Sequence, residues 1–311
     1  MGGRDERGEA GSASGGAGAG RSGPADAVTG AGAADGGEPA GGERSAYLLG
    51  SGDAELARLA FQHRAWAEAA YALWERAGFR RGATLLDLGC GPGFATVDLA
   101  HLVGPEGRVV AVDAAPRFLD HLRGLAAAHG LGWIDVRRAD AAELDLPPAS
   151  LDGAYARWLF CFLPDPGPAL AAVARTLRPG GRLAVTDYFN YRAFTLAPRS
   201  AAFDRVVEAV AAAWRREGGD LEVQGRLPGL CRDHGLEPVD LRPVVRLARP
   251  GSPLWAWPET FFRGFLPGLV DAGLLTPDDA DRFWHDWHAR AADPAAYLSL
   301  PPMIDLVAEK R

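Results

Sequence analysis

The chain has 311 residues, of which 48% are hydrophobic, and a formal net charge of −7 at pH 7. This length predicts one large domain, or one core with an elaborated cap. The acidic balance offers no electrostatic footprint for nucleic acid or for an anionic membrane surface, so we expect a small-molecule partner.

Cysteine and lysine are both scarce. Cys90, Cys161 and Cys231 are far apart and show no spacing typical of a zinc site or a disulfide framework, which fits a reducing compartment. The only lysine is Lys310, near the end of the chain, which argues against Schiff-base catalysis and against a Walker motif.

The first 44 residues are Gly, Ala and charged groups with almost no large apolar side chain, so we expect residues 1–44 to be disordered. They lack the apolar core of a signal peptide, and no later run of about 18 apolar residues predicts a transmembrane helix. A soluble, cytoplasmic protein is expected. Residues 45–82 follow as a helical N-terminal lid, with apolar residues at helical spacing from 54 to 77.

Short apolar strands then alternate with helices, which predicts parallel strand–helix–strand units and a doubly wound α/β sheet. The predicted core covers residues 83–188. Its strands are expected at 83–89, 108–113, 134–140, 151–158 and 182–188, and its helices at 94–102, 116–129 and 167–178, with a turn at 179–181.

Residues 189–311 are expected to add a helical cap and the strands that complete the sheet. Helices are predicted at 200–216 and 223–234, a strand at 238–247 and an aromatic-rich helical stretch at 253–290. We interpret the strand at 238–247 and the closing segment from 296 as a hairpin-like pair at one sheet edge, with helices inserted between them.

A glycine-rich loop follows the first core strand in the sequence LLDLGCGPGF. Gly89, Gly91 and Gly93 are two residues apart, and Phe94 stands where a dinucleotide fingerprint needs its last glycine. Asp87, at the end of the strand, would repel a phosphate and attract an ammonium group. The loop therefore favours a ligand with a cationic amino-acid end over a dinucleotide.

Two more acids end the next two strands. Asp113 has the position from which a carboxylate accepts hydrogen bonds from ribose hydroxyls, and Asp140, followed by Ala141, can accept from an adenine amino group. Together with Asp87 they describe an adenosine that carries a cationic amino acid. We therefore predict S-adenosylmethionine as the cofactor.

These segments resemble the class I S-adenosylmethionine-dependent methyltransferases of small molecules. The resemblance covers roughly residues 82–188 and is carried by LLDLGCGPG, VVAVDAAP, RRADAAEL, LDGAYARWLFCFLPDP and LRPGGRLAVTDY. It implies a seven-stranded, mostly parallel sheet with a reversed final strand. It also implies a loop at Gly89 to Gly93 under the methionine part, Asp113 and Ala114 at the ribose, and Asp140 with Ala141 around the adenine.

The upstream stretch YLLGSGDAELARLAFQHRAW is similar to the lead-in of one bacterial branch of these enzymes, in which the first helices close over the cofactor. That resemblance makes Tyr47 and Gln62 candidate lid contacts. Arg157, just past the fourth strand, is a candidate for the cofactor carboxylate.

The reacting groups are less defined by sequence. The candidates for a base are His63, His234, His285, His288, Asp187 and Tyr188, and none is assigned. Phe160, Tyr188, Phe189 and Tyr191 follow strand ends above the expected methyl group, which favours an apolar or aromatic acceptor. No acidic cluster remains beyond the cofactor acids, so no metal is predicted.

The sequence thus predicts methyl transfer from S-adenosylmethionine to a small, hydrophobic or aromatic organic acceptor. O- and N-methylation stay undecided, and C-methylation stays open. One alternative is a non-catalytic S-adenosylmethionine-binding regulatory module. A nucleotide-cofactor oxidoreductase is disfavoured by the loop spacing and Asp87. The acceptor and the oligomeric state are not predicted.

Overall fold

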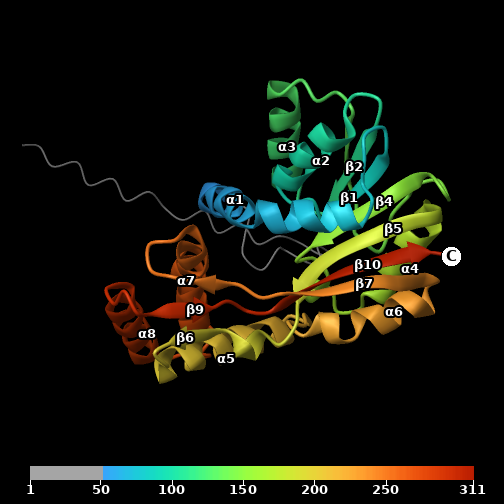
Figure 1. Ribbon diagram of the computed structural model, residues 1–311. Helices are drawn as coiled ribbons and strands as arrows, with labels where there is room; N and C mark the ends of the chain where they lie inside the picture. The colour runs from blue at the N-terminus through green and yellow to red at the C-terminus, as the bar shows by residue number, and fades with distance from the viewer. Residues whose placement is uncertain (1–51) are drawn as a thin grey trace, which may run out of the picture. The chain divides into compact units, whose positions relative to one another are not determined.

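The computed structural model describes residues 52–311, so the predicted disordered segment 1–44 and Tyr47 lie outside the described residues. The main sheet has seven strands in the order β3-β2-β1-β4-β5-β10-β7 (Figure 1). They are β1 (Thr84–Leu88), β2 (Arg108–Asp113), β3 (Ile134–Arg138), β4 (Leu151–Arg157), β5 (Leu177–Tyr188), β7 (Leu236–Val244) and β10 (Met303–Lys310).

The direction of the strands agrees with the predicted class I arrangement. Strands β1 to β5 pair in parallel, and β10 runs antiparallel to both β5 and β7. The central strands β1 and β4 are buried almost throughout, as expected for parallel strands covered on both faces. The predicted seven-stranded sheet with its reversed last strand is confirmed.

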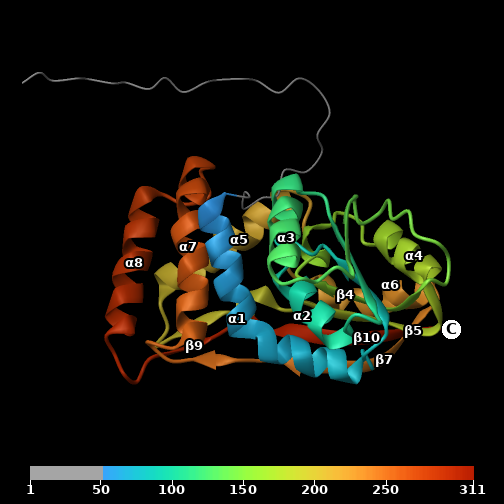
Figure 2. The ribbon, with the colours of Figure 1, turned by 90° about the horizontal axis from the view of Figure 1, so that it is seen from above.

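Helices cover both faces of this sheet. On one face lie α1 (Asp53–Arg76), α2 (Phe94–Val103) and α3 (Pro116–Ala128), and on the other lie α4 (Gly167–Thr176) and α6 (Leu227–Asp233) (Figure 1). Helix α1 also runs on toward the cap, where it contacts α7 (Pro253–Asp271) (Figure 2). No helix among the described residues is both long enough and apolar enough to cross a membrane.

The cap stands beyond the carboxyl end of β5. It consists of α5 (Ala201–Arg216), α7, α8 (Pro277–Ala291) and a small antiparallel sheet in the order β6-β9-β8 (Figure 1). The strands of that sheet are β6 (Thr195–Ala197), β8 (Leu247–Ala248) and β9 (Tyr297–Ser299). Among the 3-10 turns, η1 (Phe160–Phe162) connects β4 to α4, whereas η2 (Tyr191–Ala193) and η3 (Val223–Gly225) lie where the chain enters and leaves the first part of the cap.

Four details differ from the sequence prediction. The predicted turn at 179–181 lies within β5, which shifts its register against β4 there. The predicted helix at 223–234 is a 3-10 turn followed by the short α6. The helical stretch 253–290 is two helices, because Gly273 adopts a φ of 68° and Thr276 caps α8 in a reciprocal capping box with Asp279. The predicted strand 238–247 ends at Val244, and Leu247 joins the cap sheet instead.

Candidate active site

The glycine loop is held between the ends of β1 and β2. The backbone N–H groups of Gly89 and Cys90 both donate to the carbonyl of Val112, at 2.8 and 3.0 Å. Gly93 adopts a φ of 88° just before α2, and a Cβ placed there would lie 2.3 Å from Cδ1 of Leu122. Only glycine fits at this position, and it lets the loop pass close to Leu122 of α3 without a side chain between them.

Asp87 is buried at the carboxyl end of β1. Its side chain accepts a 2.6 Å hydrogen bond from the hydroxyl of Thr96 on α2, and the residue is only 2% exposed. Loss of water raises the pKa of Asp87 to about 6, although the Thr96 hydrogen bond and the nearby charge of Arg157 act in the opposite direction. A cationic ligand beside this carboxyl group would favour its ionised form.

Asp113 lies at the end of β2 and fixes the loop to that strand. One carboxylate oxygen accepts from the N–H of Gly91 at 2.8 Å, and the other accepts from the N–H of Ala115 at 2.9 Å. Burial raises the pKa of Asp113, against the lowering effect of these backbone hydrogen bonds. Since an ionised carboxylate has about four acceptor positions, these backbone donors leave room for a hydroxyl group of a ligand. Ala114 lies between Asp113 and the second of these donors.

Asp140 and Ala141 come two and three residues after the end of β3. The carboxylate of Asp140 accepts from the N–H of Ala142 at 2.8 Å, which closes a small turn. Asp140 is exposed, and Ala141 is half-buried. Asp87 and Asp113 therefore lie at the carboxyl ends of β1 and β2, and Asp140 follows β3. These strands are neighbours in the sheet, and this is the edge where open α/β sheets bind ligands.

A chain of hydrogen bonds connects β4 with α1 and α2. Arg157, the last residue of β4, contacts Nδ1 of His63 on α1 through a guanidinium nitrogen at 3.0 Å. Nε2 of His63 is 2.8 Å from a carboxylate oxygen of Asp98, which also accepts from the hydroxyl of Tyr71 at 2.6 Å. Burial alone would raise the pKa of Asp98, but these two hydrogen bonds bring it below its ordinary value.

The other predicted lid residue, Gln62, joins α1 to the cap. Its side-chain oxygen accepts from Arg58 at 3.0 Å and from the indole N–H of Trp257 on α7 at 2.9 Å. The structure thus places Gln62 at the contact between α1 and the cap, one residue before His63.

The aromatic residues predicted for the acceptor occupy different environments. Phe160 and Tyr191 are buried, at 0% and 5% exposure, whereas Phe189 is 41% exposed. Tyr188 is half-buried and packs edge-on against Tyr191, with 5.3 Å between ring centroids. A ligand would therefore reach Tyr188 and Phe189 more readily than Phe160.

Trp158 is a site residue that the sequence analysis did not select. It has a φ of 50°, which is a strained conformation for so bulky a residue. Its ring stacks on Trp257 at 5.8 Å and on Tyr188 at 6.3 Å, and the guanidinium of Arg157 lies 5.0 Å from the ring centroid. Trp158 therefore connects the carboxyl end of β4 with the cap, a position that only the backbone turn after β4 reveals.

Of the other base candidates, His285 and His288 are exposed on α8 in the cap, and His234 follows α6. Asp187 is fully buried, and burial raises its pKa to about 6. Its two oxygens accept from the backbone N–H groups of Cys161 and Tyr188, so it stabilises the turn after β4. His63 is the one base candidate among the histidines that is hydrogen-bonded to Arg157.

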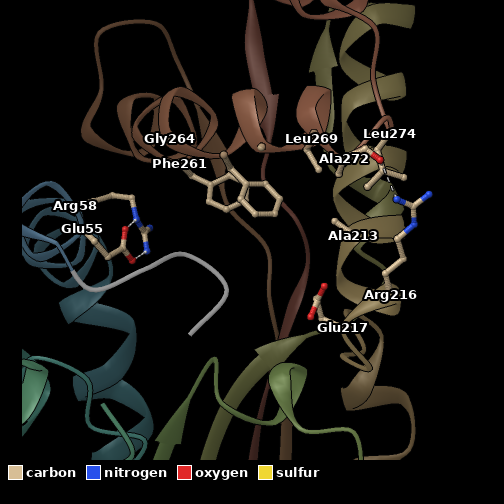
Figure 3. A pocket seen from close by; sticks show the side chains of 12 residues that line it. Glu55, Arg58, Ala213, Arg216, Glu217, Phe261, Gly264, Leu269, Ala272 and Leu274 are labelled. Carbon is tan, nitrogen blue, oxygen red and sulfur yellow. Dashed lines mark hydrogen bonds and ion pairs between the residues drawn. The ribbon is translucent and has the colours of Figure 1, made fainter. Parts of the chain in front are cut away.

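A cavity of about 300 Å³ lies between the start of α1, the end of α5 and α7 (Figure 3). Its apolar lining includes Phe261, Phe265 and Leu269 of α7. The end of α5 contributes Arg216, which donates to the carbonyl of Ala272 at 3.2 Å, and Glu55 and Arg58 of α1 line the far side (Figure 3). Its size is within the range of small-molecule sites. The four predicted acceptor residues are not among its lining side chains.

Comparison with known proteins identifies the core. A family model described as a methyltransferase domain matches residues 86–185. Residues 86–185 are a methyltransferase domain. It begins within β1, one residue before Asp87, and includes Gly89, Gly91, Gly93, Asp113, Asp140 and Arg157.

The first curated relatives each match a little over a third of this chain. The nocamycin O-methyltransferase of Saccharothrix syringae is 39% identical over 107 residues, which cover 34% of this chain and 38% of that relative. The chain spans about a third to a half of the length of the first curated relatives it matches.

Solved structures extend the likeness to the whole fold. A methyltransferase-like protein from Bacillus halodurans C-125 superposes with a TM-score of 0.54 at 16% identity, over 77% of this chain and 97% of that one. The [4+2]-cyclase SpnF superposes with a TM-score of 0.52 at 22% identity, over 78% and 80% of the two chains. The methyltransferase domain and its cap therefore share a fold that also occurs in a protein named for a different reaction.

Proposed function

We propose that this protein transfers a methyl group from S-adenosylmethionine to a small, hydrophobic or aromatic organic acceptor. The observation that carries the proposal is the arrangement of Asp87, the glycine loop and Asp113 at adjacent strand ends of the methyltransferase domain. The fold alone is insufficient because unrelated reactions share it.

The residues present fit this cofactor. Asp87 supplies a buried carboxyl group for an ammonium ion, and Asp113 keeps free acceptor positions for ribose hydroxyls. Asp140 with Ala141 would adjoin the adenine, and Gln62 and Tyr47 would belong to the lid. When bound, S-adenosylmethionine supplies a methyl group on a positively charged sulfur, ready for displacement by a nucleophile.

The chain's own contribution is alignment and exclusion of water, because both lower the barrier of a direct displacement. Trp158, Tyr188 and Trp257 form a stacked aromatic layer beside the loop end of β4. Such a layer keeps water from the reacting atoms and can stabilise a cationic sulfur through its ring faces.

The class of acceptor follows from what surrounds this layer. Phe261, Phe265 and Leu269 form an apolar wall of the adjacent cavity, and Tyr188, Phe189, Phe160 and Tyr191 supply further rings at the ends of β4 and β5. An acceptor with an aromatic or aliphatic skeleton suits both the apolar wall of the cavity and these rings. A cytoplasmic location and the lack of a nucleic-acid partner stay predictions from the sequence.

The test is turnover with S-adenosylmethionine that carries a deuterated methyl group, offered with phenols, alcohols, amines and carbon acids. We expect acceptor-dependent formation of S-adenosylhomocysteine and a product heavier by one deuterated methyl group. Binding of the cofactor without methyl transfer to any acceptor class would favour the regulatory module instead.

The variant Asp113→Ala tests the proposed cofactor site. Loss of hydrogen bonds to the ribose should weaken binding of S-adenosylhomocysteine by about 2 kcal/mol, the range for hydrogen bonds to a charged group. Because Asp113 also holds Gly91 and Ala115, thermal unfolding of the ligand-free variant is measured alongside the calorimetric affinity. Unchanged affinity in a folded variant would contradict the assignment.

A further inference from the structure

His63 and Arg157 share one hydrogen bond whose direction is fixed by chemistry. A guanidinium group has only donors, so Nδ1 of His63 must accept from Arg157 across the 3.0 Å contact. The imidazole proton then lies on Nε2, which donates to Asp98 at 2.8 Å. His63 is therefore neutral in this arrangement, with its tautomer set by a partner on each side.

A neutral imidazole provides no counter-charge in direct contact with Arg157. Within residues 52–311 no carboxylate forms an ion pair with Arg157. Its second terminal nitrogen, NH1, is buried and has no hydrogen-bond acceptor. A buried N–H donor of a cation that lacks an acceptor is costly, and an anionic ligand bound to NH1 would remove that cost.

The register of the sheet shows where this donor lies. Asp87 of β1 pairs with Tyr155 of β4, so Arg157 and Gly89, each two residues further on, are at the same level of adjacent strands. Neighbouring strands are about 4.8 Å apart. Arg157 therefore stands next to the start of the glycine loop, and its charge acts on Asp87.

Further contacts fix both the guanidinium of Arg157 and the ring of His63. It packs over the ring of Trp158 at 5.0 Å, and the ring of His63 stacks on Phe94 at the start of α2, with 6.3 Å between centroids. Asp98 on α2 fixes His63 from the other side, and Tyr71 of α1 adds a second hydrogen bond to Asp98. The side chain of His63 therefore connects α1 to Arg157 at the end of β4.

We propose that His63 is a positioning residue for cofactor recognition: it holds Arg157 so that NH1 binds the carboxylate of the amino-acid part of S-adenosylmethionine. Asp98 sets the tautomer of His63 that this requires. The ammonium group and the carboxylate of the amino acid are then recognised separately, the first beside Asp87 and the second by Arg157. This inference rests on the proposed function.

The test compares two ligands by calorimetry on the full chain. S-adenosylhomocysteine has the carboxylate, and S-adenosyl-3-thiopropylamine lacks only that group. We expect wild-type protein to prefer S-adenosylhomocysteine, and His63→Ala to lower its affinity for that ligand about tenfold, the effect of weakening a charged hydrogen bond. Affinity of the variant for the decarboxylated ligand should stay unchanged, which a general loss of structure would not allow.

Two conservative variants distinguish the role of Nδ1 of His63 from that of Nε2. His63→Asn places a carbonyl oxygen near the position of Nδ1, so it should retain most of the affinity for S-adenosylhomocysteine. His63→Gln places its amide nearer the position of Nε2 and should behave like His63→Ala. His285→Ala, at an exposed histidine of α8, is the control and should change neither affinity.

The outcomes are distinguishable. Equal affinity of the wild-type protein for the two ligands would overturn the inference while leaving the proposed cofactor intact, and so would an equal loss for both ligands in His63→Ala. Failure of wild-type protein to bind either ligand would overturn the proposed function, and the inference with it.

Discussion

Asp87 contributes to the pH dependence of the stability of the folded protein. Its folded-state pKa of about 6 is above its ordinary value, so between pH 4 and 6 the folded protein keeps a proton that the unfolded chain loses. The stability contributed by this protonated form is present below pH 4 and is lost as the pH rises through 6. Asp187 has a pKa of about 6 for the same reason, burial, and acts in the same direction.

A bound ammonium group reverses the preference of Asp87, because it favours the carboxylate. We predict that the affinity for S-adenosylhomocysteine falls about tenfold from pH 7.5 to pH 5, since one unit below a pKa of about 6 only about a tenth of the group is ionised. In Asp87→Asn, which can still accept from Thr96, the affinity should be low and the pH profile flat. Calorimetry at a series of pH values measures both. A full pH dependence in the variant would assign it to another group.

At the scale of single residues, sequence patterns identify acids at the ends of strands. They do not identify residues whose role depends on contacts with distant side chains. Asp87, Asp113 and Asp140 follow recognisable strands, and the structure puts them at adjacent strand ends. Their roles toward the cofactor stay predictions. His63 is one of several histidines in the sequence, and only its contacts with Arg157 and Asp98 distinguish it. The strained backbone of Trp158 has no sequence signal, because bulky residues rarely adopt that conformation.

The turn from the glycine loop into α2 has no room for a side chain at Gly93. In Gly93→Ala the new Cβ would overlap the side chain of Leu122, on α3, at 2.3 Å, whereas at Gly91 a Cβ meets nothing within 4 Å. Both positions have positive φ, so both variants carry about 1–2 kcal/mol of backbone strain. We predict a further loss of about 1–3 kcal/mol in Gly93→Ala from overpacking. Urea unfolding of the two ligand-free variants measures it, and equal stability would refute the packing argument.

Elements of the core were predictable because each strand is a short apolar run and each helix is bounded by Gly or Pro. The cap was less so. Strands β6 and β9 have three residues each, too few to show any alternation, and they form through tertiary pairing alone. The aromatic stretch 253–290 has the sequence pattern of one helix. In the structure Gly273 adopts a positive φ after α7, and Thr276 caps the start of α8.

On the scale of the whole molecule, Arg76 joins the first helix to the last strands. At the end of α1, it pairs with Asp240 of β7 at 2.8 Å and with Asp305 of β10 at 2.5 Å. Asp305 is buried and also accepts from the hydroxyl of Thr186 on β5 at 2.6 Å. Arg76→Ala should lower the free energy of unfolding by about 2–3 kcal/mol, because it leaves Asp305 without its counter-ion.

The matched control for Arg76 is Arg108→Ala, which breaks an ion pair with Asp135 in which the arginine side chain is half exposed. That change should cost less than about 1 kcal/mol, as exposed pairs do. Chemical denaturation of both variants gives the comparison. Similar losses would mean that the α1 anchor contributes no more than a surface pair.

The fold and the methyltransferase domain were predictable from sequence because one continuous segment carries both the strands and the loop. The cavity was not, because the residues that line it come from α1, α5 and α7 and are spread over positions 55 to 274 of the chain. Its shape depends on how the cap packs on the strand ends.

The most direct test of the account is calorimetric titration of the protein with S-adenosylmethionine, with S-adenosylhomocysteine and NADH titrated in parallel. We predict saturable binding of the two sulfur compounds at one site and no binding of NADH. Binding of NADH, or of neither sulfur compound, would contradict the claim that Asp87, the glycine loop and Asp113 form a site for an adenosine bearing a cationic amino acid.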